Sequence, residues 1–363
     1  MFIVLDTNIL FSDFHLRGAE IESVCKSIDK IGGKVCIPEV VMRETVNKYK
    51  EELTKNRKII DNGLNGIARV IQQQVPCNPI TETYVDEEVA KFETNFRRRV
   101  KELHIDVLPV PSISHDEVIA RDLARRKPFT SEGKGYRDTL IWESILILCK
   151  RAKDPIDKPI AVLINKNFKD FCEDDTYKLH PDLKNDLMTK GLREDCVRVV
   201  PAISVVTKDY IKPTQQLLQA VVDQFNNNKF YNEINLNDEV AARTTRFLEN
   251  RTFDSEDNPL CREFENPTIT DVELVDYKVV DVRVLTEENV QVDLSAKCRC
   301  SFDFYIYKAD AALLDEDEMP EIIDADWNRH YMAACKVQTL SLSISLIVDS
   351  GFTTVQSESI SID

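Results

Sequence analysis

An unbroken apolar run, Phe2–Leu5, ends at Asp6 and constrains the fold of this chain more than any other feature. Four apolar residues without polar alternation are typical of a strand buried on both faces, as in a parallel sheet covered by helices. In such sheets, ligands and catalytic groups gather beyond the carboxyl ends of the strands. A carboxylate in that position needs water, hydrogen bonds or a cation to offset its desolvation. Asp6 is therefore either the cap of a following helix or part of a functional site.

Similar segments recur along the first two hundred residues. A short apolar strand at residues 35–37 precedes a helical stretch, residues 39–44, that ends in Glu44. Two more apolar strands are expected at residues 160–164 and 197–200, and Asp138 opens a helix that is apolar nearly all round. Alternating strands and helices with acids near strand ends predict a doubly wound α/β domain with about five mainly parallel strands.

Four segments of the chain resemble, in order, the motifs of PIN-domain nucleases. They are Asp6-Thr7-Asn8, Glu44, Arg137-Asp138-Thr139 and Asn165-x-Asn167-x-x-Asp170-Phe171. The resemblance covers roughly residues 1–205. It implies a metal-dependent nuclease, most often a ribonuclease, with acids around one or two Mg²⁺ or Mn²⁺ ions.

Carried over to this sequence, the resemblance implies that Asp6, Glu44 and Asp138 are catalytic and bind the metal. The fourth ligand position departs from the family pattern, because Asn167 stands where many members have an aspartate. Asp170 follows three residues later. Either Asn167 or Asp170 completes the expected metal site.

The chemistry of these residues agrees with that expectation. Phosphodiester hydrolysis requires charge neutralisation on the phosphate and an activated water, and hard divalent cations held by carboxylates supply both. The five histidines are scattered without metal-ligand spacing. An enzyme forming an aspartyl-phosphate is disfavoured, since Asn8 occupies the place where a second aspartate is expected.

Charge is divided unevenly along the chain. Residues 238–363 contain 27 acidic against 11 basic residues, which accounts for the entire net charge of −16. Within the remaining, balanced part, a basic segment lies just before Asp138, where phosphate contacts are expected. A solvated helix face is the alternative interpretation of this segment. The predicted substrate-binding residues are Asn8, Arg125, Arg126, Lys127, Lys134 and Arg137.

We expect three regions. Residues 1–205 form the PIN-like domain, with a helical insertion at about 45–104 whose charged halves, 47–74 and 86–103, are separated by Pro76 and Pro79. This insertion is either a guide for nucleic acid or a surface helix pair. Residues 206–266 form a helical connector with a helix at 211–228. Residues 267–363 form an acidic, mainly antiparallel β domain, with an acidic loop at 314–326.

The functional expectation is a metal-dependent endonuclease that uses Mg²⁺ or Mn²⁺ and acts on RNA, a preference that rests on the resemblance. A catalytically inactive PIN-like scaffold and a structure-specific DNA nuclease are the alternatives. The β domain is expected to regulate the nuclease or to bind a protein partner or a second copy. Ten cysteines without a CxxC pair, and no signal or membrane segment, indicate a cytoplasmic protein.

Overall fold

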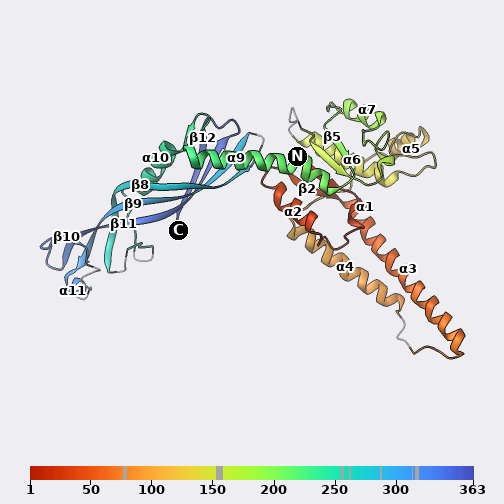
Figure 1. The fold of residues 1–363 in the computed structure, drawn as a ribbon, viewed down its shortest axis with the longest axis horizontal. Coiled ribbons are helices and arrows are strands. Elements are labelled where there is room, and N and C mark those ends of the chain that lie inside the picture. Colours follow the sequence, from red (N-terminus) through yellow and green to blue (C-terminus); the bar gives the residue numbers. More distant parts are fainter. Residues whose placement is uncertain are drawn as a thin grey trace. The chain divides into compact units, whose positions relative to one another are not determined.

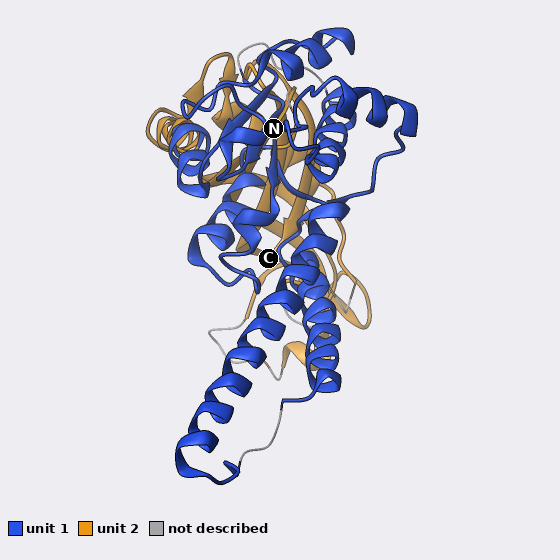
Figure 2. Cartoon of the chain, turned by 90° about the vertical axis from the view of Figure 1, so that its right-hand side faces the viewer, with its two compact units in different colours: residues 1–214 blue, residues 215–363 orange. Residues whose placement is uncertain are grey.

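The computed structural model describes the chain except for residues 77–79, 153–157, 255–256, 261–262, 287, 313 and 315–318. It divides into two compact units, residues 1–214 and residues 215–363 (Figure 2). Each unit has a hydrophobic core of its own. Pro79 and part of the predicted acidic loop lie outside the described residues.

The first unit is an α/β unit (Figure 1). In chain order its elements are β1 (Phe2–Leu5), α1 (Thr7–Leu10), α2 (Ala19–Ile28), β2 (Lys34–Pro38), α3 (Glu39–Ile71), α4 (Glu82–Glu102), β3 (Asp106–Leu108), α5 (His115–Leu123), α6 (Tyr136–Arg151), β4 (Ala161–Ile164), the 3-10 helix η1 (Phe168–Asp170), α7 (Pro181–Thr189), β5 (Val197–Val200), α8 (Ile203–Val206) and the π-helix η2 (Thr207–Ile211).

Five parallel strands form the sheet of this unit in the order β3-β2-β1-β4-β5. The predicted parallel α/β sheet is thereby confirmed, although β3 was not predicted, since two of its three residues are exposed and the third is only partly buried. β2 and β3 follow on one side of β1, whereas β4 and β5 lie on its other side, so the strand order reverses at β1. Carboxyl ends of strands on either side of such a switch leave a crevice for ligands. In this sheet the crevice lies between β1 and β4.

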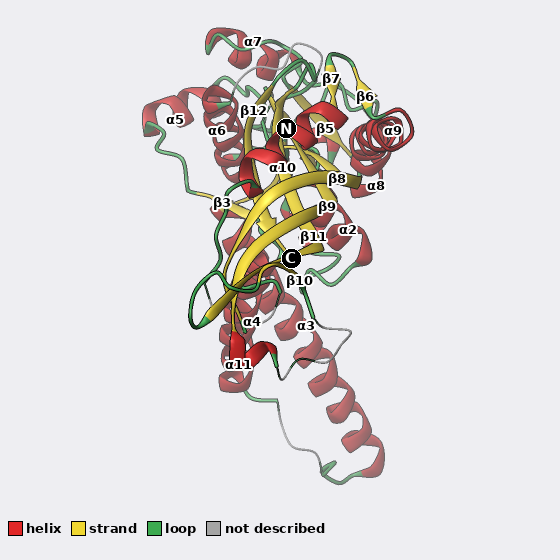
Figure 3. Cartoon of the chain, turned by 90° about the vertical axis from the view of Figure 1, so that its left-hand side faces the viewer, coloured by secondary structure: helices red, strands yellow, loops and turns green. Residues whose placement is uncertain are grey.

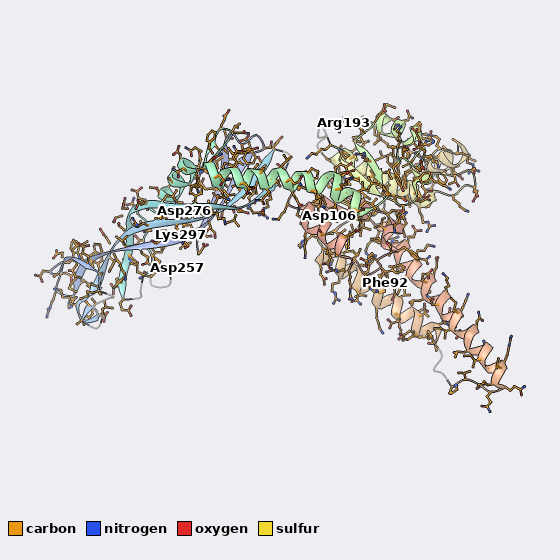
Figure 4. All side chains as sticks on the ribbon, viewed as in Figure 1. Phe92, Asp106, Arg193, Asp257, Asp276 and Lys297 are labelled. Carbon is orange, nitrogen blue, oxygen red and sulfur yellow. The ribbon has the colours of Figure 1, made fainter. Side chains whose placement is uncertain are left out.

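Helix α3 is much longer than the predicted helical stretch and includes the first half of the expected insertion. Its N-terminal part packs against α4: Tyr49 stacks on Phe92 (labelled in Figure 4) with ring centroids 4.0 Å apart. Two ion pairs join the same helices, Lys50 to Asp86 at 2.8 Å and Arg97 to Glu39 at 3.1 Å. The insertion is therefore a helical hairpin that grows directly out of the helix carrying Glu44.

The second unit combines helices with a strongly curved antiparallel sheet (Figure 3). Its elements are α9 (Lys212–Asn228), which begins three residues before the boundary between the units, β6 (Phe230–Tyr231), β7 (Ile234–Asn235), α10 (Leu236–Leu248), β8 (Phe264–Val284), β9 (Asn289–Tyr307), α11 (Lys308–Ala311), β10 (Glu321–Asp324), β11 (Tyr331–Asp349) and β12 (Val355–Ile362).

The predicted antiparallel β region is confirmed, and its strands are long. β8 begins at Phe264, three residues before the predicted boundary at residue 267, and β9 runs unbroken from Asn289 to Tyr307. The prediction of a loop throughout residues 314–326 was wrong for β10, which pairs with the start of β11. Buried and more exposed residues alternate along β9, as expected for an antiparallel strand with one face in the core. Four register shifts in β8 act as bulges that bend the strand, so alternation alone does not reveal its full length.

One face of this sheet packs on helices that precede it. Val221 and Phe225 of α9 and Val240 of α10 belong to the same buried cluster as Val292 and Leu346 of the sheet. The segment expected as a connector thus contributes to the core of the second unit. Among the helices that the structure describes, none is long and apolar enough to cross a membrane.

Candidate active site

Asp6 lies at the carboxyl end of β1, beside the end of β4. Its backbone N–H donates to the carbonyl of Ile164 at 3.2 Å, and its own carbonyl accepts from the N–H of Ile9 at 3.1 Å. The side chain does not cap α1 and is 7% exposed. Asp6 occupies the N-cap position of α1, as one of the two interpretations of the sequence required, but its side chain makes no capping hydrogen bond.

The amide of Asn8 holds the Asp6 carboxylate in place. Its Nδ2 donates to Asp6 Oδ2 and to Asn165 Oδ1, each at 2.7 Å, and its Oδ1 accepts from the N–H of Lys166 at 3.1 Å. Asn165 is fully buried and also accepts from the N–H of Asn167 at 2.6 Å. The amide of Asn8 is therefore committed to contacts within the protein, which join the loops after β1 and β4.

Glu44 enters the site from the second turn of α3. Thr7 donates a hydrogen bond to Glu44 Oε2 at 3.0 Å, and the guanidinium of Arg137 forms an ion pair with Glu44 Oε1. Since Arg137 precedes Asp138 on α6, this ion pair brings α3 and α6 together at the site. Arg137 was predicted to bind substrate, and in this structure it contacts an acid of the site.

Asp138 lies in the first turn of α6, as the sequence predicted. The helix begins after Gly135, whose φ of 137° favours glycine. A Cβ at this position would lie 2.6 Å from the carbonyl oxygen of Pro128 and 2.7 Å from Cα of Phe129. Glycine thus permits the close approach that sets the start of α6 and the place of Asp138.

Asp170, the last residue of η1, is the fourth acid of the site. Its Oδ2 accepts a hydrogen bond from Asn167 Nδ2 at 2.7 Å. Burial raises the pKa of Asp170, while the nearby Lys127 ammonium and the Asn167 hydrogen bond lower it. Asn167 and Asp170, the two candidates for the fourth ligand position, therefore both lie at the site. The amide nitrogen of Asn167 points at the carboxylate of Asp170.

All of these acids line one cleft of about 420 Å³. Burial, followed by repulsion from neighbouring carboxylates, raises the pKa of Asp6 and of Asp138 to about 7 in each case. Asp138, Glu44 and Asp170 act on Asp6, and Asp170 and Glu44 act on Asp138. The excess of carboxylates in the cleft favours protons or cations.

Within the described residues, no three His, Cys, Asp or Glu side chains converge closely enough to enclose a metal ion. Glu44 is paired with Arg137, and Asp170 accepts from Asn167. A closed cage of protein ligands is not required for Mg²⁺, which usually keeps several waters and binds through one or two carboxylates. The cleft offers oxygen ligands, and two of its carboxyl groups, those of Asp6 and Asp138, have raised pKa values. Such a set of ligands fits a hydrated divalent cation.

Three of the basic residues that were predicted to bind substrate form ion pairs outside the cleft of the acids. Arg125 pairs with Asp122 at 2.5 Å, Arg126 with Asp186 at 2.8 Å and Lys134 with Glu132 at 2.6 Å. None of these three lines the cleft of the acids. Lys127 donates through Nζ to the carbonyl of Lys169 and acts electrostatically on Asp170. Lys127 and Arg137 are thus the members of the set that reach the acids.

Several cleft residues were not predicted to belong to the site. Lys48, Glu51 and Glu52 lie four, seven and eight residues after Glu44 on α3, the spacing of one helix face. Treating residues 39–44 and 47–74 as one continuous helix would have placed them on the same face as Glu44. Thr7 and Phe11 also line the cleft, and Phe11 is 45% exposed.

Comparison with known proteins agrees with this geometry. Residues 3–171 match a family model described as PIN domain, and the first unit therefore contains a PIN domain. The match includes Asp6, Glu44, Asp138 and Asp170. Comparisons with curated proteins and with solved structures gave no match for the chain. The second unit has no family match.

Proposed function

We propose that this protein is a metal-dependent endonuclease that hydrolyses phosphodiester bonds, with RNA as its substrate. The observation that carries the proposal is the gathering of Asp6, Glu44, Asp138 and Asp170 in one cleft, with the pKa of Asp6 and Asp138 raised to about 7. A PIN domain is a nuclease fold, which gives this acidic cleft its context.

Asp6 and Asp138 would hold Mg²⁺ or Mn²⁺, with Glu44, Asp170 and Asn167 contributing directly or through water. The bound cation would neutralise phosphate charge and acidify a water for in-line attack. Asn8 fixes the orientation of Asp6, and Thr7 and Arg137 fix that of Glu44. Phosphate contacts would come from Lys127 and Arg137 near the acids, and from Arg125, Arg126 and Lys134 farther along the strand.

Two observations favour a catalytically inactive scaffold as the second candidate. The ion pair between Arg137 and Glu44 neutralises an acid that the nuclease would use, and the described acids do not enclose a metal position. A scaffold would bind partners or nucleic acid without cleavage. The two candidates differ in whether a divalent cation displaces this ion pair.

The deciding experiment compares the wild type with Asp138→Asn and with Asp209→Asn, a matched control. Asp209 is exposed and lines a different cavity. We expect Mn²⁺ to raise the Tm of the wild type and the control but not of Asp138→Asn. The wild type and the control should also cleave fluorescent single-stranded RNA. The cleavage rate of Asp138→Asn should be at least about 100-fold lower.

Parallel reactions with single-stranded, duplex and branched DNA identify the substrate. Faster cleavage of branched DNA than of RNA would replace RNA with structured DNA in the proposal. Wild-type cleavage by Asp138→Asn at saturating Mn²⁺ would remove Asp138 from the site. Absence of both a Mn²⁺ effect on Tm and any cleavage by the wild type would establish the scaffold instead.

We further propose that the acidic second unit restrains or directs the nuclease. Its excess of acids repels nucleic acid, so it is poorly suited to extend a substrate track. Asp276 and Lys297, labelled in Figure 4, are directly opposite one another on β8 and β9, and both are exposed. The excess of acids in this unit fits a basic segment of a protein partner.

A further inference from the structure

The distal half of α3 extends beyond its partner helix (Figures 1 and 2). The ion pair between Lys50 and Asp86 fixes the alignment of the hairpin, so that Glu82, the first residue of α4, lies opposite about Thr54. Helix α3 continues to Ile71. Roughly 25 Å of helix therefore runs past the start of α4.

This extension carries an apolar stripe. Ile60, Leu64, Ile67 and Ile71 follow one another at intervals of four, three and four residues, which places them on one face of the helix. Ile60 is 44% exposed, Ile67 52% and Ile71 49%, and Leu64 is partly buried, so the described part of the chain leaves about half of the stripe uncovered. An apolar face with this spacing is typical of a helix that packs along another helix.

The helix extension is poorly suited to stand alone. Gly63 and Gly66 lie within it, and glycine disfavours an isolated helix. An added Cβ at either glycine would meet nothing within 4 Å. Contacts within the described chain therefore do not explain these glycines, whereas close packing of a second helix would explain Gly63, which flanks the stripe.

We propose that the α3 extension pairs with the same segment of a second copy of this chain, in antiparallel orientation. The stripe is complementary to itself: Ile60 then faces Ile71 of the second copy, and Leu64 faces Ile67. Two-fold symmetry repeats both contacts and gives four apolar layers without a charged residue. Val70, which is 84% exposed, lies beside Gly63 of the second copy, whose missing side chain leaves room for it.

The hairpin itself selects the antiparallel orientation. In a parallel pair, the two α4 helices and the two sheets would crowd together at the same end. In the antiparallel pair, the tip of one helix at Ile71 reaches only Ile60 of the other, short of the start of α4 opposite Thr54. The length of the apolar stripe therefore matches the length of helix that is free to pair.

The dimer holds two acidic clefts at opposite ends of one helical rod. Glu44 is about 21 residues from the two-fold axis, so the two Glu44 residues would lie roughly 65 Å apart along the rod. Four layers form an interface smaller than about 1,200 Å², and dimerisation is therefore expected to depend on concentration. This assembly does not rest on the proposed nuclease activity.

Sedimentation velocity of the full chain between about 1 and 200 µM tests the association. We expect Leu64→Lys and Ile67→Lys to weaken the dimer at least about tenfold, because each buries an unpaired charge in two layers. Asn65→Lys is the matched control, since it introduces the same residue on the outer face of the same helix turn. Circular dichroism verifies that each variant keeps its helix content.

Cysteine cross-linking tests the alignment. Ile60→Cys and Ile71→Cys should form a 60–71 disulfide when the two variants are mixed, as identified by mass spectrometry, and no 60–60 or 71–71 disulfide when alone. A disulfide requires Cα atoms within about 7 Å, whereas equal positions would lie roughly 16 Å apart along the rod. A 60–60 disulfide, a dimer that survives both lysine variants, or a monomer at 200 µM would overturn the proposal.

Discussion

Among individual residues, Asp6 and Asp138 show most clearly how this site differs from ordinary surface acids. Burial raises the pKa of each to about 7, and neighbouring carboxylates add to the shift. In the unfolded chain the same groups lose their protons near pH 4. Between about pH 4 and pH 7 the folded state therefore binds more protons than the unfolded state. Their contribution to stability is present at low pH and is lost as the pH rises through 7.

Asp138→Asn should accordingly stabilise the protein in the absence of metal, and more so at higher pH. The expected gain at pH 8 is on the order of 1–3 kcal/mol, because a repelling and poorly solvated charge is removed. At pH 5 the gain should be small, since Asp138 in the wild type is then protonated. Thermal unfolding of both proteins with chelator, from pH 5 to pH 8, measures this difference.

A gain that is equal at pH 5 and pH 8 would show that the charge of Asp138 is not responsible. Asp209→Asn serves as the control in this series, since Asp209 is exposed. Addition of Mn²⁺ should reverse the order of stability at pH 8, because only the wild type then gains from the ion.

Asn8 offers a second prediction at this scale. Asn8→Ala removes two donated hydrogen bonds and one accepted bond, and leaves Asp6, Asn165 and the Lys166 N–H without that partner. The expected loss of stability in urea unfolding is about 1–3 kcal/mol. Asn62→Ala, at an exposed position of α3, should cost less than about 0.5 kcal/mol. Equal effects of the two variants would contradict the positioning role of Asn8.

Helix α6 shows that the start of an element determines where a functional side chain lies. Gly135→Ala should destabilise the protein by about 2 kcal/mol or more, because the backbone is in a glycine region and the new Cβ overlaps the Pro128 and Phe129 backbone. Gly66→Ala, within α3 and without neighbours at its Cβ, should instead stabilise by about 1 kcal/mol. Urea unfolding of both variants tests the contrast. A neutral Gly135→Ala would mean that the loop before α6 adapts freely.

For the whole molecule, the two cores predict where the chain can be divided. A fragment of residues 1–214 should fold cooperatively and keep the Mn²⁺ response, because its core is complete. A fragment of residues 1–266 should aggregate, since Phe225 and Val240 would lose the sheet against which they pack. Calorimetry and light scattering of both fragments provide the measurement. A soluble, cooperatively unfolding 1–266 fragment together with an unfolded 1–214 fragment would contradict this division.

Restraint by the acidic unit can be tested with the same material. If the 1–214 fragment cuts RNA as fast as or faster than the full chain at equal Mn²⁺, the regulatory role of the second unit is supported. A folded 1–214 fragment that binds metal but cuts none of the substrates of the full chain would make the second unit part of the catalytic machinery.

Local patterns in the sequence determined much of this protein. Apolar runs such as Phe2–Leu5 indicated buried parallel strands, and their order predicted the sheet and the strand-end position of Asp6. Alternation indicated the antiparallel sheet of the second unit. These features depend on residues close together in the chain, where periodicity reflects which face is buried.

Only the tertiary structure decided which side chains meet. The contacts of Asn8 with Asn165, and of Arg137 with Glu44, span 157 and 93 positions of the chain. Likewise, the pairing of Arg126 with Asp186 across 60 positions is invisible in a local charge count. The bulges in β8 escaped prediction for the same reason. Local patterns specify faces and lengths, whereas packing between distant segments determines which groups share a site and which stay exposed.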